Sequence, residues 1–269
     1  MSRPITEHPS TSRGHNDWNP RLLRTFLWER LRPAIDLLNR VDLSVPTTIC
    51  DLGCGAGHIT RRLASRWPAA HVTGVDESPA MLAEAQREPS GITWIEADIA
   101  SWVPERPVDL IFSNAALHWL DDHKSLLPRL LGYLRPGGVL AMQMPRNHGE
   151  PSHTAIYDAV EAGPWRDRLL PLIRLSPVAE PEAYASMLLP IVSSVDIWET
   201  VYLHMLPGNN PVVEWTSGTG LRPVLGALQG QERTDFLTDY AKRVAGAYPP
   251  RADGTTIFPF RRLFVVATV

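Results

Sequence analysis

One segment constrains the fold of this chain more than any other: residues 47–58 read Thr-Thr-Ile-Cys-Asp-Leu-Gly-Cys-Gly-Ala-Gly-His. Apolar and β-branched residues lead into an acidic residue and a glycine-rich turn, after which Ile59, Leu63 and Trp67 recur at helical spacing. This pattern predicts a strand, a tight loop and a helix. A glycine loop in this position is typical of proteins that bind a nucleoside cofactor.

The spacing of the glycines narrows the choice of cofactor. The dinucleotide-binding fingerprint needs glycine at the first, third and sixth places of its loop, the last so that helix and strand can pack closely. Gly53 and Gly55 occupy the first two places, but His58 stands at the third. The bulky imidazole argues against NAD. The spacing Asp51-x-Gly53-x-Gly55-x-Gly57 instead resembles the first motif of the class I S-adenosylmethionine-dependent methyltransferases.

Length and charge bound the class of protein. The chain has 269 residues, 44% of them hydrophobic, which is enough for one large domain or two small ones with a sizeable core. The formal charge of -3 gives no electrostatic reason to expect nucleic acid as a partner. Cys50 and Cys54 are too few for a disulfide framework and are compatible with a reducing cytoplasm.

The apolar patterning argues against a membrane protein. Residues 1–16 are rich in Pro, Ser, Thr, Arg and His, which predicts a flexible tail and not a secretory signal. A spanning helix needs about 18 consecutive apolar residues, and the sequence has no such stretch. We therefore expect a cytoplasmic protein without a membrane partner, and nothing in the sequence sets its oligomeric state.

Strand patterns alternate with helical patterns along the chain. Seven stretches are predicted as strands: 47–52, 71–76, 92–97, 108–113, 138–144, 195–205 and 263–269. Near-continuous apolar runs separated by helices predict a parallel sheet covered on both faces, with the last strand pairing antiparallel to 195–205. We therefore predict the α/β class, with a Rossmann-like, seven-stranded, mostly parallel methyltransferase sheet.

Helical segments outside this alternation predict a cap over the pocket. We expect a single domain over 17–269, with cap elements from 17–40, about 149–190 and about 208–248. In the first of these, Leu23, Phe26 and Leu27 begin a helical period, while Pro33 is expected to start the second of two helices. Residues Trp18-Asn19-Pro20 and this lead-in are predicted to close over the bound cofactor.

Polar residues follow four consecutive predicted strands. Asp51 ends the first, Asp76 the second, Asp98 follows the third, and Asn114 ends the fourth. Because the carboxyl ends of parallel strands meet at the ligand site, Asp76 is expected to accept from ribose hydroxyls and Asp98 from the adenine amino group. The Ile99 backbone would face the same ring. Each residue also has a structural alternative as a helix cap or a turn residue.

Further segments resemble the trans-aconitate methyltransferases, a family that esterifies a carboxylate of a small tricarboxylic acid. The resemblance covers most of the chain after residue 16, and the segments that carry it are 17–20, 29–30, 32–34, 51–55, 66–70, 78–81, 96–99, 139–145, 195–198 and 219–223. One departure is Phe-Pro-Phe-Arg-Arg-Leu-Phe at 258–264, where the family has Phe-Pro-Arg-Leu-Phe. It leaves open whether Arg261 or Arg262 faces the pocket.

This resemblance implies a positioning mechanism. A carboxylate with a pKa near ~4 is already ionised at neutral pH, so no general base is required and no catalytic residue is assigned. Holding the acceptor oxygen in line with the methyl group is the enzyme's task. Cationic and hydroxyl donors are therefore expected to bind the carboxylates that are not methylated. The predicted acceptor-binding residues are Tyr202, His204, Trp215, Arg222, Arg262 and His118.

Other interpretations of these residues stay open. An arginine in a loop, such as Arg222, is usually a solvated charge, and Arg262, beside Arg261 at a strand start, can protect a sheet edge from pairing. Trp215 can be part of the hydrophobic core. If Tyr202 and His204 face inward, Leu203 must face outward. Arg30 is predicted to approach the cofactor carboxylate, although a neighbouring acidic partner is the commoner fate of such a residue.

No metal site is predicted, because Asp121-Asp122-His123 is better explained as the cap of the following helix. Three functions are compatible with the sequence. The first is methylation of trans-aconitate or a related small polycarboxylate by S-adenosylmethionine. The second keeps this cofactor and uses a different small-molecule acceptor. The third is a noncatalytic module that binds S-adenosylmethionine.

Overall fold

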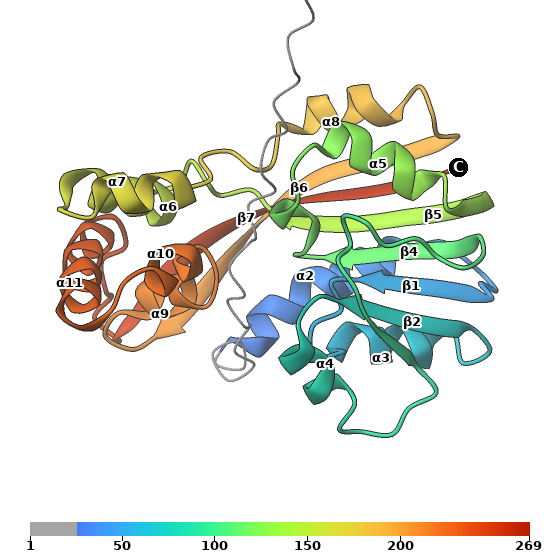
Figure 1. Cartoon of the computed structure of the whole chain (residues 1–269), viewed down its shortest axis with the longest axis horizontal. Helices are drawn as coiled ribbons and strands as arrows, with labels where there is room; N and C mark the ends of the chain where they lie inside the picture. The colour runs from blue at the N-terminus through green and yellow to red at the C-terminus, as the bar shows by residue number, and fades with distance from the viewer. Residues whose placement is uncertain (1–25) are drawn as a thin grey trace, which may run out of the picture.

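A computed structural model describes residues 26–269, which form one seven-stranded sheet between helices and a helical lobe at one end (Figure 1). The predicted tail at 1–16 and the predicted closing segment at 18–20 lie outside the described residues. The strands are β1 (Thr48–Leu52), β2 (His71–Asp76), β3 (Thr93–Glu96), β4 (Val108–Asn114), β5 (Leu134–Pro145), β6 (Ser194–Pro207) and β7 (Thr255–Thr268).

The strand order is β3-β2-β1-β4-β5-β7-β6, and the predicted seven-stranded, mostly parallel sheet with an antiparallel last strand is confirmed. Strands β3, β2, β1, β4 and β5 pair in parallel, and β7 pairs antiparallel to both β5 and β6. The chain leaves β1 for β2 on one side and returns to β4 on the other. The carboxyl ends of β1 and β4 therefore form the topological switch point, where open α/β sheets bind ligands.

Helices cover both faces of the sheet. Helices α2 (Leu27–Arg40) and α3 (His58–Arg66) share one apolar cluster with Ile49 of β1 and Phe112 of β4. Helices α5 (His123–Leu131) and α8 (Pro181–Leu188) share the other cluster with Leu52 and Ile111. Helix α4 (Pro79–Ala85) contacts β2 and β3. Burial on both faces explains why these strands are almost continuously apolar.

Strands β6 and β7 extend beyond the rest of the sheet and carry the helical lobe (Figure 1). The lobe contains α6 (Pro151–Ala162), α7 (Arg166–Leu169), the 3-10 turn η2 (Leu170–Leu172), α9 (Pro211–Ser217), α10 (Arg222–Gly226) and α11 (Gly230–Ala247). A separate apolar cluster around Trp215, Phe236 and Phe258 holds it together. The predicted cap segment at 149–190 is thus divided, because α6 and α7 belong to the lobe whereas α8 covers the sheet.

Two boundaries differ from the prediction. Helix α2 runs without interruption through Pro33, so the expected pair of helices is wrong for the described part of this segment. Pro33 is buried beside Leu37 and Ala34, and this packing outweighs the loss of one backbone hydrogen bond. Strand β7 begins at Thr255 and not at 263, although it contains Pro259. Its pairing with β5 starts only at Arg262, so Pro259 lies where β7 has a single neighbour.

Two local predictions are confirmed. Asp122 caps α5, and its carboxylate accepts a hydrogen bond of 3.3 Å from the Ser125 backbone N–H. On β6, Tyr202 and His204 are buried while Leu203 is 57% exposed, as the alternation of faces requires. Within residues 26–269, no helix is both long and apolar enough to cross a membrane.

Candidate active site

A cavity of about 1560 Å³ opens at the switch point and continues between the sheet and the helical lobe. Its walls bring together the ends of β1, β2 and β4, the first turns of α2, and segments of α6, α9, α10 and β7. Eleven of the fourteen predicted site residues line it: Gly53, Gly55, Asp76, Asp98, Ile99, Asn114, Arg30, His118, Trp215, Arg222 and Arg262. Asp51, Tyr202 and His204 do not appear in this wall.

The glycine loop is shaped by close packing. Gly53 has a φ of +76°, and a Cβ there would lie 2.1 Å from the Cβ of Ala116. Its N–H donates to the Val75 carbonyl at 2.8 Å. Gly55 has a φ of +53°, and a Cβ there would meet no atom within 4 Å. The backbone at Gly53 is thus pressed against the β4 loop, whereas Gly55 presents bare backbone to the cavity.

Asp76 ties the glycine loop to the end of β2. Its Oδ2 accepts from the Gly55 N–H at 2.8 Å, and its Oδ1 accepts from the Ser78 N–H at 3.0 Å. Burial raises the pKa of Asp76, and the two backbone donors oppose that effect. A carboxylate has about four acceptor sites, so Asp76 retains capacity for further donors in the cavity.

The next two strand ends supply different polar groups. Asp98 is exposed, and its Oδ1 accepts from the Ala100 N–H at 2.8 Å, a turn contact and not the helix cap that was its structural alternative. The Asn114 Oδ1 is buried and has no hydrogen-bond partner among residues 26–269. Ala115 follows it with a φ of 53°, a conformation that few residues other than glycine adopt. Such strain at a strand end is typical of ligand sites.

Asp51 has a supporting position and not the predicted place in the cavity wall. It is 2% exposed, and its Oδ2 accepts from the Thr60 hydroxyl at 2.6 Å. Burial raises the pKa of Asp51 to about 7, which the Thr60 hydroxyl partly offsets. This hydrogen bond joins β1 to the first turns of α3 and so fixes the loop between them.

Two guanidinium groups lie on the side of the cavity formed by α2 and β7. Arg262 is 4% exposed, and burial, followed by repulsion from Arg30, lowers the pKa of its guanidinium to about 9. Burial also lowers the pKa of Arg30 to about 10. Arg30 donates to the Trp215 carbonyl at 3.2 Å and lies 4.5 Å from the centre of that indole. Neither arginine forms an ion pair with any of residues 26–269.

Successive side chains of β7 point to opposite faces, and this decides which of Arg261 and Arg262 faces the cavity. Arg262 lines the cavity, whereas the Arg261 side chain is 38% exposed and pairs with Glu150 at 3.6 Å and Glu199 at 3.5 Å. Arg222 begins α10 on the lobe side of the same cavity.

Tyr202 and His204 stand behind Trp215. The His204 ring stacks on the Trp215 indole with centroids 4.8 Å apart and on the Tyr202 ring at 6.1 Å. The Tyr202 hydroxyl donates to Asp36 Oδ2 on α2 at 2.7 Å. These two residues therefore support the wall made by Trp215 and do not form it.

Sequence reasoning missed three basic residues that line the cavity: His148, His153 and Arg174. His148 follows the end of β5, so the rule that singled out the ends of the first four strands would also have found it. His153 lies on α6, where helical periodicity suggests only packing. Arg174 lies in a loop and carries no signal in the sequence.

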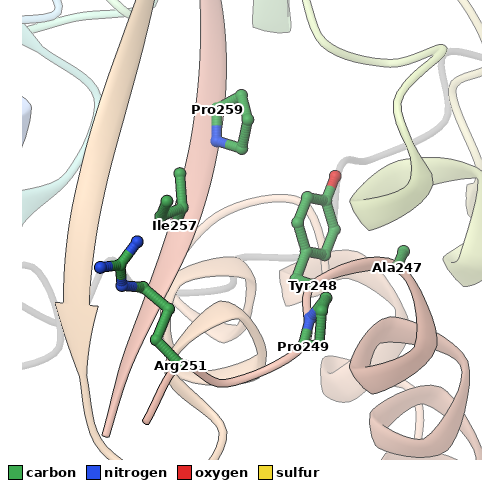
Figure 2. Close-up of a pocket in the computed structure, with 6 residues that line it drawn as sticks. All are labelled: Ala247, Tyr248, Pro249, Arg251, Ile257 and Pro259. Atoms are coloured by element: carbon green, nitrogen blue, oxygen red, sulfur yellow. The ribbon is translucent and has the colours of Figure 1, made fainter. Parts of the chain in front are cut away.

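A second, smaller hollow of about 310 Å³ lies at the outer end of the lobe (Figure 2). It is formed by the end of α11 and the first part of β7, with Tyr248, Ile257 and Pro259 as its larger apolar side chains. Arg251 is its only charged side chain among the described residues. This hollow contains none of the predicted site residues.

Comparison with known proteins agrees with this geometry. A family model described as a methyltransferase domain matches residues 49–138. Phosphoethanolamine N-methyltransferase 2 of Haemonchus contortus superimposes with a TM-score of 0.56 at 16% identity, over 91% of this chain and 56% of that one. The YcgJ protein of Bacillus subtilis gives 0.54 at 12% identity, over 87% and 96%. The fold and the cavity at the switch point define a methyltransferase of the Rossmann-like class.

Sequence relatives identify the family within this class. A trans-aconitate 2-methyltransferase of Methylobacterium radiotolerans is 47% identical over 254 residues, which cover 93% of this chain and 98% of that protein. Proteins of the same name from Azoarcus sp. and Paracidovorax citrulli are 46% and 45% identical, over 93% and 94% of this chain and 98% of each relative. This chain belongs to the trans-aconitate 2-methyltransferase family.

Proposed function

We propose that this protein transfers a methyl group from S-adenosylmethionine to a carboxylate of trans-aconitate or a closely related small polycarboxylate. The products are a monomethyl ester and S-adenosylhomocysteine. The relatives that carry this name support the proposal. The observation that carries it is the pair of guanidinium groups, Arg30 and Arg262, which share a cavity with the glycine loop and have no carboxylate partner among residues 26–269.

The residues at the strand ends fit the methyl donor. Gly53 and Gly55 both line the cavity, Gly55 presents bare backbone to it, and Asp76 retains acceptor capacity for the ribose hydroxyls. The buried, unpartnered Oδ1 of Asn114 fits the donor's ammonium group. When bound, S-adenosylmethionine supplies an electrophilic methyl group on a sulfonium, and its sulfur is a neutral thioether after transfer.

The basic side of the cavity fits an acceptor with several negative charges. Burying an arginine without a partner is costly, and an anionic ligand removes that cost. We therefore propose that Arg30 binds the acceptor together with Arg262, and not the donor carboxylate, because both line the cavity and the charge of Arg30 acts on Arg262. Two fixed guanidinium groups hold the acceptor so that one carboxylate oxygen stays directed at the methyl carbon.

The proposed chemistry needs no proton transfer. The acceptor carboxylate is ionised near pH 7, and the bond to its oxygen forms while the carbon–sulfur bond breaks. The charged donor and acceptor neutralise each other in the transition state, so the chain's contribution is orientation and the exclusion of water. Such positioning is worth up to ~7–11 kcal/mol.

A methyl-transfer assay with a panel of acids tests the proposal. The purified protein is incubated with S-adenosylmethionine carrying a radiolabelled methyl group and with trans-aconitate, cis-aconitate, citrate and a monocarboxylate. We expect base-labile label on trans-aconitate, little label on the monocarboxylate, and S-adenosylhomocysteine in equal amount. Label on none of the polycarboxylates, with donor binding intact, rejects the proposed acceptor class.

We also propose that the protein acts in the cytoplasm on a small acid. A small acid as acceptor requires neither nucleic acid nor a membrane as partner. The two cysteines, Cys50 and Cys54, are free and buried, which supports a reducing cytoplasm as the place of action.

A further inference from the structure

Three imidazoles form a cluster in the cavity wall between the sheet and the lobe. His118 comes from the 3-10 turn η1 (Leu117–Trp119), His148 from the loop after β5, and His153 from α6. The His148 and His153 rings meet edge to face with centroids 5.0 Å apart. We call these residues the histidine cluster. Among residues 26–269, no three histidine, cysteine, aspartate or glutamate side chains are grouped to hold a metal ion.

The cluster has unused hydrogen-bonding capacity. The Nδ1 atoms of His118 and His148 are buried and have no partner among residues 26–269. The Nδ1 atom of His153, by contrast, lies 3.1 Å from the Ser152 hydroxyl and 3.4 Å from the Asn147 amide. A buried polar atom without a partner is uncommon in a native fold, and one in a cavity wall calls for a polar ligand atom.

Positive charge surrounds these nitrogens. Arg174 donates to the His118 carbonyl at 2.6 Å and pairs with Asp121 at 2.5 Å. Burial, followed by repulsion from Arg174, lowers the pKa of His148 to about 4. Burial also lowers the pKa of His118 well below its usual value, and repulsion from His148, Arg174, Arg262 and His123 adds to this. The imidazoles are therefore neutral near pH 7, each with one N–H donor and one acceptor nitrogen.

The loop that carries His148 is held rigidly. Its first residue, Arg146, pairs with Glu199 on β6 at 3.1 Å through Nη2 and with Glu180 at 2.7 Å. The Arg146 N–H donates to the Arg261 carbonyl at 3.0 Å, and the Glu150 N–H donates to the Asn147 carbonyl at 3.0 Å. A side chain on so constrained a loop loses little freedom when it binds a ligand.

We propose that His148 is a specificity-determining residue, whose imidazole donates a hydrogen bond to a carboxylate of the acceptor that is not methylated, while Arg262 holds another carboxylate. This inference rests on the proposed function. A neutral donor suits this place, because the cavity already contains several fixed positive charges. The wall thus distinguishes acids by whether a carboxylate reaches the histidine cluster as well as Arg262.

The test combines removal of the His148 side chain with acceptors that each lack one carboxylate of trans-aconitate. Mesaconate, itaconate and glutaconate each lack a different one of the three carboxylates of trans-aconitate. For wild type and His148→Leu, kcat and KM are measured for each acid. We expect His148→Leu to raise the KM for trans-aconitate by about 10- to 100-fold, as for one lost hydrogen bond to a charged group, with kcat changed less than about threefold. For the acid that lacks the carboxylate bound by His148, KM should change less than about threefold.

Two further variants separate binding from folding. His148→Gln keeps an N–H donor and should restore KM to within about fivefold of wild type, whereas His71→Leu alters an exposed histidine at the start of β2, outside the cavity wall, and should change nothing. Equal penalties of His148→Leu for all methylated acids, or a loss in kcat alone, overturn the inference while leaving the proposed function intact. A wild-type protein that methylates none of these acids overturns both.

Discussion

The Arg262 Nη1 atom donates a hydrogen bond of 3.2 Å to the Oε1 atom of Gln143, across the antiparallel pair β7 and β5. Gln143 is fully buried, and the Arg262 guanidinium also lies 4.6 Å from the centre of the Phe260 ring. A long side chain that is held in this way keeps its charge at one point in the cavity. The cost is a desolvated cation, which the Gln143 amide and the Phe260 ring offset only in part and which an anionic ligand would compensate further.

The first prediction concerns the cost of this charge. Arg262→Gln should lower kcat/KM for trans-aconitate by about 100-fold or more, mostly through KM, because a hydrogen-bonded ion pair with the acceptor is lost. The same change removes a buried, unpaired cation and should raise Tm by about 2–4 °C, as about 1 kcal/mol does in a large domain. Thermal unfolding and steady-state kinetics measure the two effects.

Arg261→Gln is the matched control for this prediction. Arg261 lies one residue away, but its ion pairs with Glu150 and Glu199 are outside the cavity wall. Ion pairs that remain partly exposed to solvent contribute little, so KM and Tm should stay close to wild type. If Arg261→Gln raised KM as much as Arg262→Gln, the assignment of Arg262 as the inward residue would be wrong.

The second prediction concerns the glycine loop. Gly53→Ala places a Cβ 2.1 Å from that of Ala116, at a φ of +76°, so the loop or the β4 end must move. We expect the affinity for S-adenosylhomocysteine, measured by calorimetry, to fall by at least about tenfold. Gly91→Ala is the control, because a Cβ at Gly91 meets nothing within 4 Å. Unchanged binding by Gly53→Ala would show that the ligand does not depend on this loop.

The sequence predicts well those features of the fold that depend on patterns within a few neighbouring residues. The glycine loop, the strand ends at Asp76 and Asn114, and the alternation at Tyr202 and His204 all follow from patterns within a few residues. The expected break at Pro33 and the expected start of the last strand at 263, beyond Pro259, are wrong for the opposite reason. Each proline is tolerated because of tertiary packing or a missing neighbour strand, which no local pattern records.

The basic side of the cavity depends on contacts between distant segments. Arg30 and Trp215 are separated by 185 positions in the sequence, and yet the guanidinium donates to the tryptophan carbonyl. Arg174 reaches the His118 carbonyl across 56 positions. The resemblance to a family pointed to Arg222 and Arg262, but only the folded chain shows which basic residues share one cavity and which, like Arg261, turn away.

The third prediction is that the free energy of unfolding depends on pH because His204 titrates differently in the folded and unfolded chain. Burial, followed by repulsion from Arg262, Arg32 and Arg30, lowers the pKa of His204 to about 4 from 6.5. Between these values the unfolded chain binds a proton that the folded chain does not, so stability falls as the pH drops below about 6.5. At about 1.4 kcal/mol per pH unit, the free energy of unfolding at pH 5 is lower by about 2 kcal/mol on this account.

Urea unfolding of His204→Gln at pH 7.5 and pH 5 tests this dependence. The variant should lose about 2 kcal/mol less than wild type between the two values, although it is less stable at pH 7.5 because the stack on Trp215 is lost. The wild type and the variant must be compared because Asp51 changes the pH dependence of stability in the opposite direction to His204. Its pKa is raised to about 7, so its contribution grows as the pH falls. Equal losses in both proteins would exclude His204 as the source.

The last prediction concerns the hydrogen bond that joins α2 to β6. The Tyr202 hydroxyl donates to Asp36 Oδ2 at 2.7 Å, and Asp36 lies on the same helix as Arg30, six residues further along. Tyr202→Phe and Asp36→Asn each weaken this contact, so each should lower the free energy of unfolding by about 1 kcal/mol. Since Arg30 is carried by the same helix, we also expect the KM for trans-aconitate to rise by about three- to tenfold, with kcat little changed.

A double-mutant cycle distinguishes this contact from two independent effects. If the hydrogen bond links the residues, Tyr202→Phe with Asp36→Asn costs about as much as either change alone, both in stability and in KM. Additive costs would mean that Tyr202 acts through its stacking on His204 and not through α2. The cycle therefore decides whether the position of Arg30 depends on a single hydroxyl group on the neighbouring strand or on the packing of the whole helix.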